Sequence, residues 1–140
     1  MKFGDFAIGQ VFKTKSFKVT KNDIMRFAGE FDPQYMHLDE EKAKQGRFNG
    51  IIASGIHTIS ISFKLWIEEG IYGDDVIAGT QMNNIKFIKP VYPGDELNTI
   101  VEVIDKKEKT ETGIITVLLS TYNDKKEKVF EGDLSVLVKQ

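Results

Sequence analysis

Apolar and polar residues alternate with a period of two over residues 11–19, VFKTKSFKV, a pattern typical of a half-buried strand. Residues 20–31 change to a helical period after Thr20, and Asp23 three positions later gives the start the look of a capping box. The apolar face of this segment consists of Ile24, Phe27 and Ala28. We therefore expect a strand followed by an amphipathic helix, which Pro33 ends.

Two further helices are predicted before the middle of the chain. Residues 38–46 indicate a short helix with Asp39 at its N-cap. Residues 54–70 indicate the main helix, with Ser54 as candidate N-cap and Gly70 as the stop. Its main apolar stripe comprises Ile56, Ile59, Phe63 and Trp66, and a second comprises Ile61 and Leu65. A helix that is apolar on most sides must be wrapped by other parts of the protein.

The second half of the chain supplies that wrapping. Four segments rich in Val, Ile, Thr and Phe predict strands: 76–91, 96–105, 113–123 and 128–139. The lysine-rich pieces 105–113 and 123–128 between them are expected to be solvated hairpin tips. We therefore predict an α+β fold in which a curved antiparallel sheet wraps one long helix, with residues 1–140 forming a single domain.

Composition removes several classes of function. Cysteine is absent, which excludes disulfides, thiolate catalysis and cysteine-ligated zinc. The net charge is -2, with no basic block, so nucleic acid is not an expected partner. No apolar run is long enough for a signal peptide or a membrane span, and we expect a cytoplasmic protein without a membrane partner. The two histidines and scattered carboxylates match no zinc spacing.

The stretch FDPQYMHLDEE, residues 31–41, gathers the candidate chemistry. Asp32, Gln34 and His37 stand close together in what the sequence predicts to be a loop closed by Pro33. A carboxylate and an imidazole at this separation can hold one water molecule between them and share its deprotonation. An Asp before a proline is also a common turn starter, so the case for Asp32 depends on His37.

Three stretches resemble the MaoC-like dehydratase family, which has the hotdog fold and includes the (R)-specific enoyl-CoA hydratases. FAGEFDPQYMHLDEE is similar to the family's hydratase motif, Asp-x-Asn-Pro-x-His after a phenylalanine-led helix. FNGIIASGIHT resembles the Ile-Ala-His-Gly-Met segment that opens the central helix. IKFIKPVYPGDEL resembles the family's Phe-x-x-Pro-Val-x-x-Gly-Asp-x-Leu strand and turn. Together these stretches span nearly the whole chain in the expected order.

The resemblance implies reversible hydration of 2-enoyl thioesters of coenzyme A or acyl carrier protein, as in fatty acid metabolism, with no cofactor and no metal. It assigns Asp32 and His37 to the reacting water. It places the thioester oxygen at the backbone N–H of Gly55, where the helix dipole is positive. Ser54 and Gln34 would support substrate binding. Because a lone hotdog sheet leaves an edge unpaired, at least a homodimer is expected, with the site near its interface.

The chain also departs from the family pattern. Gln34 replaces the motif's Asn, and Ser54 replaces the His of Ile-Ala-His-Gly. A rival alignment would give Glu30 the place of the acid. A thioesterase is an alternative function, although the central helix carries no acid before Glu68. A non-catalytic acyl-thioester binder is another. The second histidine, His57, is expected to make a structural hydrogen bond.

Overall fold

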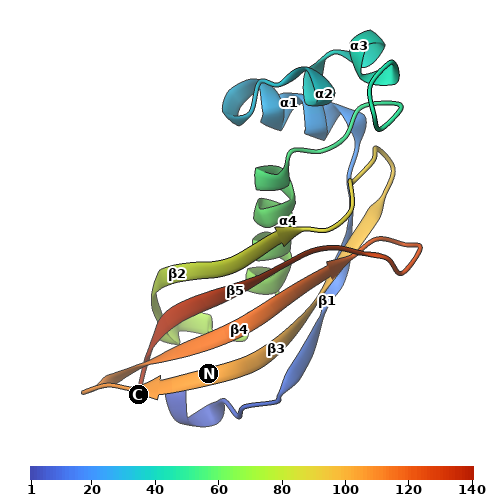
Figure 1. Ribbon diagram of the computed structural model, residues 1–140. Coiled ribbons are helices and arrows are strands. Elements are labelled where there is room, and N and C mark those ends of the chain that lie inside the picture. The colour runs from blue at the N-terminus through green and yellow to red at the C-terminus, as the bar shows by residue number, and fades with distance from the viewer.

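The computed structural model describes all 140 residues and contains one sheet, one long helix and a group of shorter helices (Figure 1). The strands are β1 (Val11–Lys18), β2 (Val76–Phe87), β3 (Glu96–Glu108), β4 (Thr112–Tyr122) and β5 (Lys128–Lys139). The helices are α1 (Lys21–Phe31), α2 (Tyr35–Leu38), α3 (Glu40–Lys44) and α4 (Gly55–Glu68). Short 3₁₀ helices occupy Phe3–Asp5 and Gly73–Asp75. The predicted order of elements is confirmed.

The five strands form a single antiparallel sheet in the order β1-β3-β4-β5-β2, which confirms the predicted α+β architecture. The two lysine-rich connections are shorter than expected, because β3 continues to Glu108 and leaves residues 109–111 as the tip. The edge strands of the sheet are β1 and β2. Every residue of β2 except Ile85 is exposed, so this edge is open along its length.

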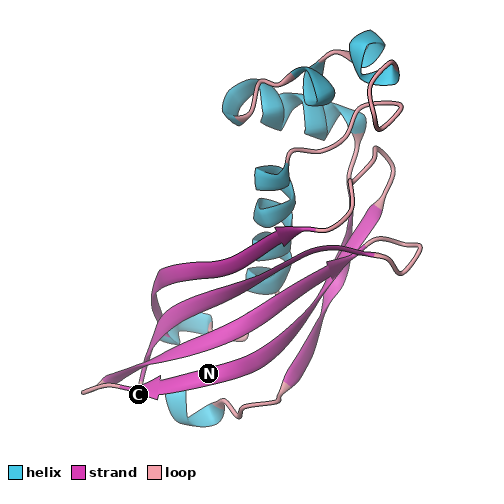
Figure 2. Ribbon diagram, viewed as in Figure 1, coloured by secondary structure: helices cyan, strands magenta, loops and turns pink.

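The core lies between α4 and one face of the sheet (Figure 2). Alternate residues of β3 and β4 point into it, and the register pairs Val101 with Leu119 and Val103 with Val117. From α4 the core receives Ile61, Leu65 and Trp66. Full burial of such a side chain contributes about 1.5–3 kcal/mol to the free energy of unfolding. This packing fixes where the first turn of α4 lies.

The face of α4 that the sheet covers differs from the prediction. The main stripe was expected to be covered, but Ile56 and Phe63 are 51% and 41% exposed. The buried face contains Ile61 and Leu65, the second stripe, together with Trp66. The helix is apolar around most of its circumference, so the period alone did not determine which side meets the sheet. Ile56 and Phe63 of the main stripe are left without a partner in the monomer, whereas Trp66 is buried and Ile59 packs against the core.

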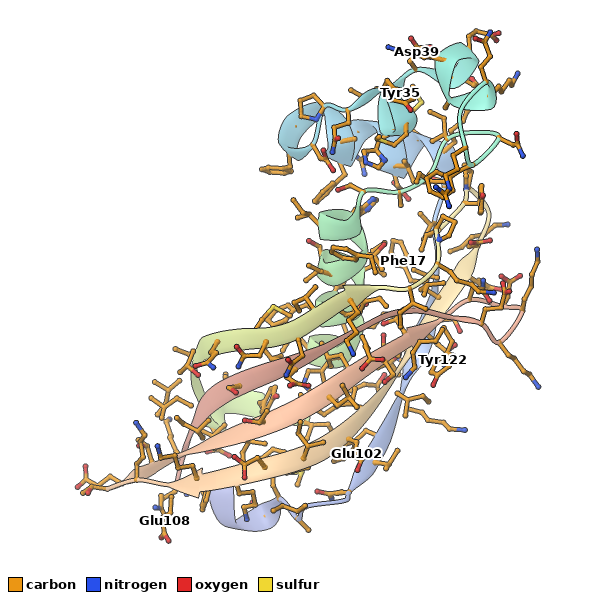
Figure 3. All side chains as sticks on the ribbon, viewed as in Figure 1. Phe17, Tyr35, Asp39, Glu102, Glu108 and Tyr122 are labelled. Atoms are coloured by element: carbon orange, nitrogen blue, oxygen red, sulfur yellow. The ribbon has the colours of Figure 1, made fainter.

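Helices α1, α2 and α3 form a small layer beyond the N-terminal end of α4 (Figure 1). Figure 3 shows Tyr35 and Asp39 in this layer, far from Glu108 at the opposite tip of the sheet. The side chains of Thr20 and Asp39 cap α1 and α3 as predicted, accepting the backbone N–H groups three residues on. This layer carries the residues of the predicted loop.

The prediction that residues 31–41 form a loop without helix is wrong at α2. Pro33 forces the backbone before it out of the helical region, and Asp32 has φ -153° and ψ 71°. Gln34 then has the extended conformation of an N-cap residue, and one helical turn follows it. The backbone N–H of His37 donates to the carbonyl of Gln34 at 3.1 Å. His37 therefore sits on a fixed turn.

Candidate active site

Asp32 lies at the C-cap of α1, and two side chains hold its carboxylate. The hydroxyl of Ser54 donates to Oδ2 at 2.6 Å. The amide of Gln34 donates to Oδ1 at 2.6 Å. Each carboxylate oxygen thus has its own donor, and the carboxylate is fixed between the end of α1 and the start of α4.

His37 is buried, with 5% of its surface exposed, and its ring has a defined orientation. Nδ1 lies 2.6 Å from the backbone carbonyl of Ile52. A carbonyl oxygen only accepts, so Nδ1 carries the proton of the neutral ring and Nε2 presents its lone pair. Nε2 lies 3.3 Å from Oδ2 of Asp32. The backbone of the segment before α4 therefore sets the tautomer of His37.

The surroundings of Asp32 favour its ionised form. The hydrogen bond from Ser54 has the largest effect and lowers the pKa of Asp32, and the hydrogen bond from Gln34 lowers it further. Burial acts in the opposite direction, and the nearby His37 adds a smaller lowering effect. The site therefore contains a carboxylate whose ionised form is favoured, 3.3 Å from Nε2 of His37.

Gly55 is the first residue of α4, so its backbone N–H has no acceptor within the helix. The ring of Phe87, from the end of β2, lies directly over its α-carbon. A Cβ atom built on Gly55 would lie 2.7 Å from Cζ of Phe87. Any larger residue would require this ring to move, and the free N–H of Gly55 stands at the positive end of the helix dipole.

A cavity of about 480 Å³ joins these groups, and Asp32, His37 and Gly55 all line it. Most of its wall is apolar and comes from the segment before α4 and from the chain after β2. The apolar lining includes Met36, Phe48, Ile56, Phe87, Ile88 and Val91. A mostly apolar cleft with a few convergent polar groups is the usual form of a small-molecule site.

The other candidate residues do not all lie at this cavity. Ser54 holds the N-cap position of α4, but its side chain bonds Asp32 instead of capping the helix. Gln34 lines the cavity and bonds the same carboxylate. Glu30, the rival acid, does not line this cavity and belongs to a smaller one beside α1. The expected hydrogen bond of His57 is absent, because the ring stacks on Phe27 instead.

The acids at the end of α4 lie away from the cavity. Glu68 pairs with Lys64 at 2.9 Å, and Glu69 accepts the backbone N–H of Lys15 at 3.1 Å. Neither residue lines the cavity. A thioesterase reaction driven by a carboxylate of the central helix therefore has no acid within the site.

Sequence reasoning missed two parts of the site. One is the carbonyl of Ile52, which selects the tautomer of His37, and a backbone group leaves no mark in the sequence. The other is Phe87 above Gly55. A signal for Phe87 was available, since it is the phenylalanine of IKFIKPV, one of the three stretches that carry the resemblance.

No group of three or more His, Cys, Asp or Glu side chains is arranged to hold a metal ion. None of the four α-helices combines the length and the apolar character that a membrane span requires.

Known proteins resemble this chain over most of its length. Residues 5–123 match the family model described as MaoC like domain. The uncharacterized protein YdeM of Bacillus subtilis (strain 168) is 76% identical over the full length of both chains.

Solved structures give the same result. The MaoC-like dehydratase from Rhodospirillum rubrum is 33% identical with a TM-score of 0.92, over 100% of this chain and 97% of that one. The (R)-hydratase from A. caviae is 23% identical with a TM-score of 0.78, over 94% of this chain and 96% of that one, and shares the hotdog fold. With its fold and most of its length matched, the chain belongs to the MaoC-like dehydratase family.

Proposed function

We propose that the protein reversibly adds water to 2-enoyl thioesters, giving 3-hydroxyacyl thioesters. The observation that carries this proposal is the ionised Asp32 beside the lone pair of His37, in a cavity that also contains the free N–H of Gly55. Membership of a hydratase and dehydratase family supports the reaction class. We also propose that residues 1–140 form a single domain.

In the hydration direction, a water molecule would bind between Asp32 and His37. Oδ2 of Asp32 and Nε2 of His37 both accept hydrogen bonds, so the water donates one proton to each and directs its oxygen lone pair into the cavity. The oxygen attacks Cβ of the enoyl group as one of the two bases takes a proton. Positioned acid and base groups of this kind contribute about 10² to 10⁴ to the rate.

The electrons of the double bond move toward the thioester carbonyl as the C–O bond forms. The negative charge that develops on the carbonyl oxygen is stabilised by the N–H of Gly55. The proton taken from the water is then delivered to Cα, which closes the balance of atoms and charge. The reverse sequence removes water from the 3-hydroxyacyl thioester. No cofactor is needed for either direction.

Two features support an acyl thioester as substrate. The cavity wall is mainly apolar and suits an acyl chain, and the Gly55 N–H suits a carbonyl oxygen. The thiol carrier, coenzyme A or acyl carrier protein, would lie outside the cavity. Both carriers would present the same thioester group to the site.

The test is a panel of enoyl thioesters of increasing chain length, offered to the wild type and to Asp32→Asn and His37→Ala. We expect turnover by the wild type and a fall of about 10² or more in kcat/KM for each variant, as expected for loss of an acid or base group. Absence of turnover with every member of the panel would overturn the proposal. Equal activity of the wild type and both variants would remove Asp32 and His37 from the mechanism.

We infer that the protein acts as a homodimer. The exposed apolar stripe of α4, defined by Ile56, Phe63 and Ile67, has no cover in the monomer. The open edge of β2 offers unpaired backbone groups to a second copy of the same strand. Because Phe87 ends β2 and lines the cavity, pairing along β2 would bring the site next to the interface.

A further inference from the structure

The hairpin tip that joins β4 to β5, residues 123–127, lies beside the wall of the candidate active site (Figure 1). Lys89 lines the cavity, and its Nζ lies 2.6 Å from Oε2 of Glu127 in the tip. The backbone N–H of Ile88, another lining residue, donates to the carbonyl of Val129 at 2.8 Å. Val129 also lines the cavity, so the tip continues directly from the cavity wall.

The buried side chain of Asn123 fixes the conformation of the tip. Its Oδ1 accepts the backbone N–H groups of Lys125 and Glu127, each at 3.0 Å, and its Nδ2 donates to Oε1 of Glu127 at 3.0 Å. Lys126 completes the turn with φ 62°, a left-handed conformation in which glycine or asparagine is the usual residue. The turn therefore holds the backbone of Lys125 and Lys126 in a fixed position beside the cavity.

Two cations of the tip are uncompensated. The acids of the tip have other partners, because Glu127 pairs with Lys89 and Asp124 accepts a backbone N–H of β3 at 3.3 Å. Lys125 and Lys126 form no ion pair. The hydrogen bond from Lys89 has the largest effect in lowering the pKa of Glu127, whereas Lys125 has the smallest. The charges of Lys125 and Lys126 are therefore free to meet an anion.

A further free cation lies on another part of the cavity mouth. Phe48 lines the cavity and is 37% exposed, so it belongs to the mouth. Arg47 directly precedes it, is exposed and forms no ion pair. The hydroxyl of Tyr92 donates to the carbonyl of Phe48 at 3.0 Å, which ties this loop to the chain after β2. We call the cations around the mouth the basic rim: Arg47, Lys89, Lys125 and Lys126.

The distance from the cavity to the tip suits the carrier end of an acyl thioester. A pantetheine arm separates the thioester sulfur from the first phosphate of the carrier, and its roughly 13 bonds correspond to about four extended residues, or about 14 Å. Lys126 precedes Val129 of the cavity wall by three residues, at most about 11 Å along the chain. An arm that leaves the cavity past Lys89 therefore brings its phosphate to the basic rim.

The number and spacing of these cations favour coenzyme A over a protein carrier. Coenzyme A presents a diphosphate and a 3′-phosphate close together, which a few cations around one mouth can bind. An acidic carrier protein presents one phosphate and also needs a broad basic docking face of about 800 Å². The chain has a net charge of -2 and no basic block, so a face of that kind is not available.

We propose that the basic rim binds the phosphates of coenzyme A, and that coenzyme A carries the acyl group of the substrate. The inference rests on the proposed function, because it takes the thioester to lie in the candidate active site. Lys125 and Lys126 bind the carrier and do not touch the reacting atoms. Loss of their charge should therefore change KM for a coenzyme A thioester rather than kcat.

Binding is tested first, with saturated thioesters that cannot be hydrated. The probes are butyryl-coenzyme A, butyryl-3′-dephospho-coenzyme A and butyryl-pantetheine, each titrated into the protein by calorimetry. We expect affinity to fall in this order by about tenfold or more in total, since each exposed charge pair contributes up to about fivefold. At roughly 1 M salt, where charges are screened within about 3 Å, the difference should disappear. Equal affinities at low salt, or no binding of butyryl-coenzyme A, would overturn the proposal.

The variant Lys125→Gln/Lys126→Asn removes both free charges of the tip, and asparagine tolerates the left-handed backbone at the second position. The matched control, Lys107→Gln/Lys109→Gln, removes two charges from the hairpin between β3 and β4, which Glu108 marks at the opposite end of the sheet in Figure 3. We expect the tip variant to bind butyryl-coenzyme A about tenfold more weakly and butyryl-pantetheine as the wild type does. The control should keep both wild-type affinities.

Turnover is tested second, with crotonyl thioesters of coenzyme A, pantetheine and acyl carrier protein. The wild type should have a KM about tenfold lower for crotonyl-coenzyme A than for crotonyl-pantetheine, and the tip variant should lose this difference. A lower KM for the acyl carrier protein thioester than for crotonyl-coenzyme A would identify a protein carrier and overturn the proposal.

The two proposals fail in different ways. Turnover of enoyl thioesters with the same KM for crotonyl-coenzyme A in the wild type and the tip variant overturns the role of the basic rim and leaves the hydratase proposal intact. Phosphate-dependent binding that the tip variant loses, without turnover of any enoyl thioester, overturns the hydratase proposal and leaves the assignment of the basic rim standing.

Discussion

The hydroxyl oxygen of Ser54 lies 2.6 Å from Oδ2 of Asp32, although 22 positions separate the two residues. This hydrogen bond joins the start of α4 to the end of α1. The same carboxylate oxygen faces Nε2 of His37 at 3.3 Å. The bond therefore positions the carboxylate relative to the imidazole, and it also stabilises the ionised form of Asp32.

Removing the hydroxyl in Ser54→Ala should affect both the position of the Asp32 carboxylate and the stability of its ionised form. The hydrogen bond lowers the pKa of Asp32, so its loss raises that pKa toward the ordinary value for an aspartate. If Asp32 must be ionised to act, the acid limb of the kcat/KM profile moves to higher pH. Hydrogen bonds to charged groups contribute about 1.5–3 kcal/mol, which corresponds to a loss of roughly ten- to a hundredfold at neutral pH.

The pH profile of turnover measures the effect of Ser54→Ala. The matched control is Ser60→Ala, whose hydroxyl on the exposed side of α4 bonds the carbonyl of Ile56 at 2.9 Å and does not reach the site. The control should keep the wild-type profile. An acid limb that stays in place in Ser54→Ala would show that the carboxylate does not control turnover.

The fold was largely predictable because its patterns are local. The β-branched segments and the cap residues Thr20 and Asp39 defined element type and order directly. The side of α4 that meets the sheet was not predictable, since Ile56, Phe63 and Ile61 are equally apolar and only the sheet distinguishes them. Which residues become buried depends on contacts between segments that are far apart in the sequence.

For the candidate site, sequence spacing brought Asp32 and His37 together but not their partners. Ser54 was expected near the substrate and instead bonds Asp32, because the end of α1 and the start of α4 meet only in the folded chain. The short helix α2 was missed because Pro33 breaks the pattern just before a single helical turn. Four residues are too few for periodicity to indicate a helix.

A second prediction concerns the space above Gly55. In Gly55→Ala the new Cβ would lie 2.7 Å from Cζ of Phe87, so the ring must move. Phe87 is 57% exposed, so we expect the movement to cost little stability, less than about 1 kcal/mol by analogy with other surface substitutions. The displaced ring and the new methyl group should obstruct the approach to the N–H and lower kcat/KM.

The double variant Gly55→Ala/Phe87→Ala separates the two effects. If the displaced ring is the obstruction, the double variant regains part of the lost activity while Phe87→Ala alone changes activity little. Thermal unfolding of all three variants provides the stability control. Wild-type turnover by Gly55→Ala would show that no substrate group approaches this backbone.

A third prediction concerns a buried chain of hydroxyl groups that ties α4 to the sheet. Ser62 donates to the carbonyl of Thr58 at 2.8 Å and lies 2.6 Å from the hydroxyl of Thr121. Thr121 lies 2.8 Å from the hydroxyl of Thr99. Because the single proton of Ser62 is used, Thr121 must donate to Ser62 and accept from Thr99.

The variant Thr121→Val keeps the shape of the side chain and breaks this chain at its centre. It leaves the donor of Thr99 and an acceptor of Ser62 unpaired, which should cost about 1–3 kcal/mol in the free energy of unfolding. Thr121→Ser is the matched control, since it keeps the hydroxyl. Urea denaturation measures both variants, and a Thr121→Val protein as stable as the wild type would contradict a stabilising role for this chain of hydroxyl groups.

The last prediction tests the homodimer through the exposed stripe of α4. Phe63 is 41% exposed in the monomer, so Phe63→Lys should leave the monomer fold intact, whereas a charge buried between two copies is costly. We expect the wild type to have the mass of two chains by light scattering and Phe63→Lys to shift toward one. Dissociation should also make the melting temperature of the wild type rise with protein concentration.

The control for the dimer is Lys64→Ala, a neighbouring exposed position whose partner Glu68 lies on the same helix. This variant should keep the dimeric mass. Because Phe87 links the open edge of β2 to the cavity, Phe63→Lys should lose activity in parallel with dimer mass as the protein is diluted. Full activity in a variant shown to be monomeric would mean that each chain holds a complete site. A wild type with the mass of one chain at every concentration would contradict the dimer itself.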